Sequence, residues 1–206
     1  MMVKTVLTFS LISGAALPSA FALPSVTFTD GPGNTGGGEF NAVTSANGNF
    51  ITFCLEYNEH ISFGPKFYYN VSDTARYGGN NTLDPLSRGA AWLYLHLTAG
   101  DLAGYDHSAA QADLFQKAIW YLEDESAGEN NSYVTAAANA NGGLDEAKKD
   151  NNGLYGVGVM NLWANPDGTG ASQDQLIRVP EGGTIVAIFG LVITGLGLVH
   201  RRFRQA

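Results

Sequence analysis

The sequence predicts an α+β fold, in which an antiparallel β core holds an inserted helical subdomain. Three observations support this prediction. Residues 25–72 contain short runs of alternating apolar and polar side chains between glycine-rich turns, which is typical of antiparallel strands. Residues 84–140 repeat apolar side chains at helical spacing. Residues 154–164 and 173–179 return to strand-like runs that would complete the sheet.

The first 22 residues have the features of a signal peptide. Lys4 provides a short positive start, and an uncharged, mainly apolar run follows over residues 6–17. Ala20 and Ala22 then frame a small-x-small cleavage site. We therefore expect the chain to be exported and cleaved after Ala22, which leaves residues 23–178 as the ectodomain.

The C-terminal end predicts a single membrane span. Residues 182–199 carry no charged side chain and are long enough to cross a thin bilayer. Three arginines follow at once, at positions 201, 202 and 204. Because clustered basic residues remain on the cytoplasmic side of a membrane, the residues before the span would face outward. This topology agrees with the signal peptide.

Residues 179–206 also resemble the PEP-CTERM sorting signal of Gram-negative bacteria. Val179, Pro180 and Glu181 match the start of its motif. Gly182 replaces the usual second proline, and Gly183 resembles the glycine of the related Val-Pro-Asp-Ser-Gly variant. The resemblance implies that an exosortase of the inner membrane removes the span and transfers the protein to the cell surface or the medium. A plain C-terminal membrane anchor is the alternative.

Cys54 is the only cysteine of the chain, within the expected strand "NFITFCLEY" over residues 49–57. Alternation places Phe53 and Leu55 on one face, and Cys54 and Glu56 on the opposite face among polar neighbours. An unpaired thiol is a liability in an exported protein, because it oxidises or couples to another chain. Cys54 is therefore either a buried small apolar side chain or bonded to a partner other than cysteine.

Three helices are expected in the middle of the chain. The first would take Asp84 as its N-cap, place Pro85 in its first turn and end at Gly100. The second begins at Ser108, which forms a capping-box pattern with the residue three positions later. A third, alanine-rich helix is expected near residues 133–140.

Two motifs resemble those of bacterial thioester domains. They are "FCLEY" at residues 53–57 and "LFQKAIW" at residues 114–120, and a looser likeness covers residues 35–178. The resemblance implies that the Gln116 amide acylates the Cys54 sulfur with loss of ammonia. It also implies a surface adhesin whose thioester reacts covalently with an amine or hydroxyl on a partner. Where the family commonly has threonine before the glutamine, this chain has Phe115.

The physical requirements of such a bond are consistent with these motifs. A fold that holds thiol and amide in contact gains the large effective concentration of an intramolecular reaction. It must also exclude water, and Phe53, Phe115, Trp120 and Tyr121 are placed in the sequence to do so. Such a cross-link would remove about 4 kcal/mol of unfolded-chain entropy, by the model used for disulfides.

Other classes of function have less support in the sequence. The net charge of −8 disfavours nucleic-acid binding. No motif pairs Cys54 with His60, His96 or His107 as a catalytic base, so we do not expect an enzyme. The cluster of Glu56, Glu59 and His60 and the loop 165–170 lack metal-site spacing, so neither metal nor cofactor is expected.

The main alternative is a noncovalent structural or carbohydrate-binding protein of the exopolysaccharide matrix. Its cysteine would be inert, and exposed aromatic side chains would stack on sugars. The candidates are Tyr68, Tyr69, Trp92 and Trp163. Reactivity towards small amines distinguishes this alternative from the thioester, because only a thioester would be labelled at Gln116.

Overall fold

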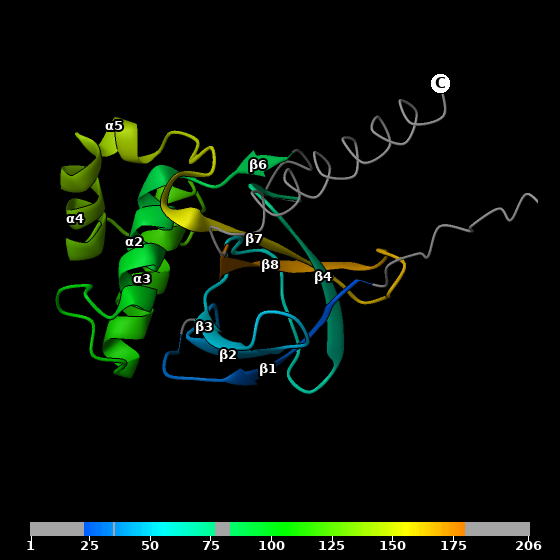
Figure 1. Cartoon of the computed structure of the whole chain (residues 1–206). Coiled ribbons are helices and arrows are strands. Elements are labelled where there is room, and N and C mark those ends of the chain that lie inside the picture. Colours follow the sequence, from blue (N-terminus) through cyan, green and yellow to red (C-terminus); the bar gives the residue numbers. More distant parts are fainter. Residues whose placement is uncertain (1–22, 35, 77–82, 180–206) are drawn as a thin grey trace, which may run out of the picture.

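A computed structural model describes residues 23–34, 36–76 and 83–179 (Figure 1). The predicted signal peptide, with its cleavage site at Ala20 and Ala22, lies outside these residues. So do the predicted transmembrane segment 182–199 and, apart from Val179, the predicted sorting motif. Within the described ranges, no helix has the length and apolar character needed to span a bilayer.

Six strands form one antiparallel sheet in the order β3-β2-β1-β4-β7-β8. Their bounds are β1 Ser25–Asp30, β2 Phe40–Thr44, β3 Asn49–Thr52, β4 Lys66–Ser72, β7 Val157–Trp163 and β8 Ala171–Arg178. A separate two-stranded ladder joins β5 (Thr74–Ala75) to β6 (Asp84–Pro85). The predicted α+β class with a large antiparallel sheet is confirmed.

The helices follow β6 and precede β7 in the chain, and they gather at one side of the sheet (Figure 1). They are α2 Arg88–Ala99, α3 Ala109–Leu122, α4 Ser132–Asn141 and the short α5 Leu144–Ala147. A 3₁₀ turn, η1 (Leu154–Gly156), leads back into β7.

The N-cap predicted for α2 was wrong. Ser87 is the N-cap, and its hydroxyl accepts a hydrogen bond from the Ala90 backbone N–H at 3.2 Å. Asp84 and Pro85 instead belong to β6, because Asp84 pairs with Ala75 across the small ladder. The predicted stop at Gly100 is confirmed, since this residue has the left-handed φ of 75° that favours glycine.

The start of α3 at Ser108 is confirmed. The Ser108 hydroxyl caps the helix by accepting from the Gln111 N–H at 3.4 Å. The third helix, α4, begins after Asn131, whose side-chain oxygen accepts from two backbone N–H groups of the first turn. These caps fix where the helices begin and therefore which side chains face the sheet.

The segment that follows β3 joins the two outer strands of the sheet. The backbone N–H of Leu176 in β8 donates to the Phe53 carbonyl at 3.1 Å, and the Leu55 N–H donates to the Asp174 carbonyl at 3.2 Å. Cys54 lies between these two bonds and forms an antiparallel bridge with Gln175. The sheet is therefore closed at this point, and Cys54 sits at the closure.

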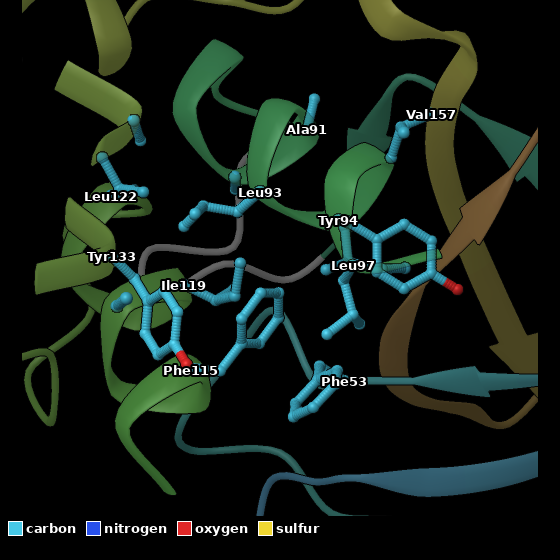
Figure 2. Close-up of a cluster of buried hydrophobic side chains, with 14 of the residues drawn as sticks. Phe53, Ala91, Leu93, Tyr94, Leu97, Phe115, Ile119, Leu122, Tyr133 and Val157 are labelled. Atoms are coloured by element: carbon cyan, nitrogen blue, oxygen red, sulfur yellow. The ribbon is translucent and has the colours of Figure 1, made fainter. Parts of the chain in front are cut away.

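Two clusters of buried side chains result from this arrangement. One, here called the helix–sheet core, lies between the helices and the sheet and includes Phe53, Leu93, Phe115 and Ile119 (Figure 2). The other, here called the sheet core, is built from strand residues. Its members are Val26, Phe28, Phe40, Ala42, Cys54, Phe67, Tyr69, Met160, Leu162 and Ile177.

Candidate functional site

Cys54 is completely buried and belongs to the sheet core. As expected from the alternation, it points to the opposite side from Phe53 and Leu55, which belong to the helix–sheet core. The expectation that this side is polar was correct only in part. Closure of the sheet places Cys54 in the apolar sheet core, while its polar contacts come from two glutamines.

The first of these glutamines is Gln116 of α3, which is also completely buried. Its side-chain amide forms two hydrogen bonds with the backbone of Cys54. The Cys54 N–H donates to Gln116 Oε1 at 3.1 Å, and Gln116 Nε2 donates to the Cys54 carbonyl at 2.9 Å. The structure therefore brings together the two residues that the sequence motifs singled out, although they lie 62 positions apart.

Gly37 packs directly against this pair. Its carbonyl accepts a second hydrogen bond from the Cys54 N–H, at 2.8 Å. A Cβ placed on Gly37 would lie 2.7 Å from Gln116 Cδ and 2.5 Å from Trp120 Cζ2. No side chain fits there without displacing its neighbours. In the sequence, only the glycine run at residues 36–38 marks this position.

The second glutamine is Gln175 of β8, whose Nε2 donates to the Cys54 Sγ at 3.3 Å. Burial raises the pKa of the Cys54 thiol, the Gln175 hydrogen bond lowers it, and the Glu56 carboxyl raises it again. Burial dominates, so the sulfur is a neutral thiol at physiological pH. Sequence reasoning missed Gln175, for which the only signal was the polar triplet at residues 173–175.

Two carboxyl groups lie close to the closure. The Asp174 N–H donates to Glu56 Oε2 at 3.1 Å, and Glu56 is 2% exposed. Burial raises the pKa of Glu56, and the nearby Asp174 and Glu59 carboxyls raise it further. Both burial and the neighbouring carboxyls therefore favour the protonated form of Glu56.

The histidines considered as catalytic bases have other contacts. His96 Nδ1 lies 2.7 Å from Asp101 Oδ1, and His107 Nδ1 lies 2.9 Å from Glu39 Oε2. His60 lines a pocket beside Trp120. Across the residues that the structure describes, no cluster of three or more His, Cys, Asp or Glu side chains could hold a metal ion.

The prediction of exposed aromatic side chains was wrong for two residues. Tyr69 is 1% exposed, and its hydroxyl donates to Asn47 Oδ1 at 2.5 Å. Trp163 is 7% exposed, and its Nε1 donates to Asn70 Oδ1 at 2.9 Å. Tyr68 and Trp92 are half-buried. Tyr69 and Trp163 are therefore too deeply buried to stack on a sugar.

The chain matches no protein-family model, no curated protein and no solved structure.

Proposed function

We propose that the chain is an exported surface protein whose ectodomain carries an internal thioester between Cys54 and Gln116. The paired hydrogen bonds between the Gln116 amide and the Cys54 backbone are the observation that carries this proposal. They hold the amide beside the one residue of the chain that bears a thiol. The resemblance of both motifs to bacterial thioester domains supports the same reading.

Formation of the bond needs only groups that are present at the site. The proposed step joins Cys54 Sγ to Gln116 Cδ. The C–S bond forms, the C–N bond breaks, and the thiol proton leaves with the amide nitrogen as ammonia. The Cys54 N–H already donates to Oε1, where negative charge develops during the attack.

The same site can store the bond. Both residues are completely buried, and Gly37 and Trp120 cover the amide from the side of the glycine run. Water is therefore kept from the carbonyl carbon. Attack by an amine or hydroxyl of a partner breaks the C–S bond, regenerates the Cys54 thiol and leaves the partner joined to Gln116.

The sequence of the two ends supports the route to the surface. The signal peptide at residues 1–22 would start export, and the sorting signal at 179–206 would hold the chain in the inner membrane until an exosortase acts. The final location would be the cell surface or the extracellular matrix of a biofilm. Nucleic acid is no part of this role, since the chain has a net charge of −8.

Intact mass spectrometry of the exported chain tests the proposal, with Cys54→Ala as the matched variant. The wild type should be heavier than Cys54→Ala by one ammonia less than the substitution alone predicts, because only the wild type loses ammonia. Methylamine should then add to wild type alone, at Gln116. If the masses differ by the substitution only and methylamine does not add, the noncovalent structural or carbohydrate-binding alternative replaces the adhesin.

A further inference from the structure

A pocket of about 360 Å³ opens beside the Cys54–Gln116 pair. It is lined by Gly36, Tyr57, Asn58, His60, Trp120 and Gln173. Its volume lies in the lower part of the range for small-molecule sites, roughly 300–1,000 Å³. Trp120 lies one helical turn after Gln116 on α3, and both side chains approach Gly37. A molecule in this pocket would therefore be close to the proposed thioester, and its attack needs the side chains that cover the fully buried Gln116 to move aside.

Two polar groups of the pocket lack partners. Trp120 Nε1, a donor, and Gln173 Oε1, an acceptor, are buried without a hydrogen bond to any residue that the structure describes. Trp120 is 3% exposed and Gln173 is 2% exposed. A buried polar group without a partner costs about 1–3 kcal/mol. Both atoms have almost no accessible surface, so a ligand in the pocket supplies the missing bonds when the two side chains turn toward it.

The unpaired groups select the chemistry of that ligand. A hydroxyl accepts a hydrogen bond from the Trp120 N–H, donates one to the Gln173 oxygen and still keeps a lone pair for attack. An ammonium group has no lone pair to accept with, and a neutral amine would use its only lone pair on Trp120. The pair of groups therefore favours an alcohol over an amine.

Tyr57 points to the kind of alcohol. Its side chain is 41% exposed at the pocket, and its ring meets the Trp120 ring edge to face with centroids 5.1 Å apart. An exposed aromatic ring beside hydrogen-bonding groups suits the apolar face of a sugar ring. We propose that this pocket is the acceptor site of the thioester and that it admits a carbohydrate hydroxyl, an inference that rests on the proposed function.

The transfer step balances without any further reagent. The sugar oxygen forms a bond to Gln116 Cδ as the bond from Cδ to the Cys54 sulfur breaks. The hydroxyl proton passes to the departing sulfur, which becomes the thiol again. The product is an ester between the sugar and the side chain at position 116. Trp120 and Gln173 act as specificity residues, because they orient the hydroxyl before attack.

The test follows adducts of the exported chain by intact mass during incubation with glucose, N-acetylserinamide or methylamine. Trp120→Phe keeps an aromatic ring but removes the N–H group together with one ring of the indole. Trp92→Phe is the matched control, because Trp92 on α2 does not line the pocket. We expect glucose to add faster than N-acetylserinamide. Trp120→Phe should slow glucose addition about tenfold, as loss of one hydrogen bond predicts, with a much smaller effect on methylamine.

The outcomes separate this inference from the thioester itself. Ammonia loss and methylamine addition without any glucose adduct would overturn the carbohydrate acceptor and leave the thioester standing. If Trp120→Phe slowed glucose addition and methylamine addition equally, the carbohydrate acceptor would also be overturned and the thioester would stand. If no thioester forms, a glucose titration of Cys54→Ala followed by tryptophan fluorescence tests whether the pocket binds sugar. A saturable change that Trp120→Phe abolishes would support the sugar pocket, and a flat titration would refute it.

Discussion

The ring centroids of Phe53 and Phe115 lie 4.5 Å apart, and the residue after each ring belongs to the candidate site. The aromatic contact packs in the helix–sheet core, while Cys54 and Gln116 meet beside it. One docking of α3 against the closure of the sheet therefore makes both contacts. The stability of the core and the geometry of the site are coupled through these adjacent pairs.

The first prediction concerns the residue before the glutamine. Phe115→Thr would introduce the hydroxyl common in thioester domains, but Phe115 is fully buried and also packs against Tyr105 and Tyr133. We expect a loss of about 3 kcal/mol or more in the free energy of unfolding, as for other large aromatic truncations. Urea denaturation measures it. Phe115→Leu should lose much less, and equal stability of Phe115→Thr and wild type would show that the ring contact is unimportant.

The second prediction concerns the glycine that covers the amide. Gly37→Ala would force its Cβ to within 2.7 Å of Gln116 Cδ and so displace the amide from Cys54. We expect thioester formation to slow at least tenfold and the fold to lose about 1–3 kcal/mol by overpacking. Mass spectra recorded during refolding provide the rate. Gly48→Asn is the control, since nothing lies within 4 Å of a Cβ there and asparagine tolerates its φ of 74°.

The third prediction assigns a positioning role to Gln175. Its hydrogen bond to Sγ stabilises the sulfur as negative charge develops on it, and Gln175→Leu removes that bond. A hydrogen bond to a charged group contributes about 1.5–3 kcal/mol, so the rate of ammonia loss should fall roughly tenfold or more. A second assay uses Gln116→Leu, which blocks the thioester and leaves the Cys54 thiol unmodified. Adding Gln175→Leu to this variant should slow alkylation of the thiol both below and above neutral pH. Unchanged rates in both assays would exclude the role.

The fourth prediction concerns the dependence of stability on pH. Glu123 accepts hydrogen bonds from the Ser87 N–H and hydroxyl at 3.1 and 2.6 Å. Burial raises its pKa from 4.5 to about 8, although the Ser87 bonds lower it. The Glu123 carboxyl therefore binds its proton more tightly in the folded state than in the unfolded state. Stability contributed by this proton is present below pH 4.5 and is lost as pH rises through about 8.

Glu123→Gln provides the matched variant for this effect. The glutamine oxygen can accept the same two bonds from Ser87 but does not ionise. Urea midpoints measured from pH 4.5 to pH 8.5 should fall less steeply in the variant than in wild type. Parallel curves for the two proteins would contradict a buried, proton-binding carboxyl at this position.

The sequence was informative wherever a local signal decides the outcome. Ser108 and Gly100 mark helix ends because a cap depends on one side chain or one backbone angle. Cys54 and Gln116 each stand in a short motif, so their pairing could be predicted across the chain. Asp84 was the wrong cap because pairing with Ala75, a contact outside the helix, holds it in a strand.

The remaining parts of the site have no local signal. Gly37 and Gln175 reach Cys54 only because β3 and β8 meet at the closure of the sheet. A strand pattern predicts which face a residue occupies but not which distant strand lies beside it. The burial of Tyr69 and Trp163 was missed for the same reason, since Tyr69 packs in the sheet core and Arg76 of a distant segment lies over the Trp163 ring.

The pairing of β7 with β8 has a mechanical consequence. Val157 at the start of β7 is the register partner of Arg178 at the end of β8. A partner joined to Gln116 and pulled against a fixed C-terminus would load these two residues at the same end of the hairpin. Such a load breaks the hydrogen bonds between β7 and β8 one after another from that end, rather than all at once. Under tension the chain would lengthen while the covalent link held, so the ectodomain would act as an extensible tether.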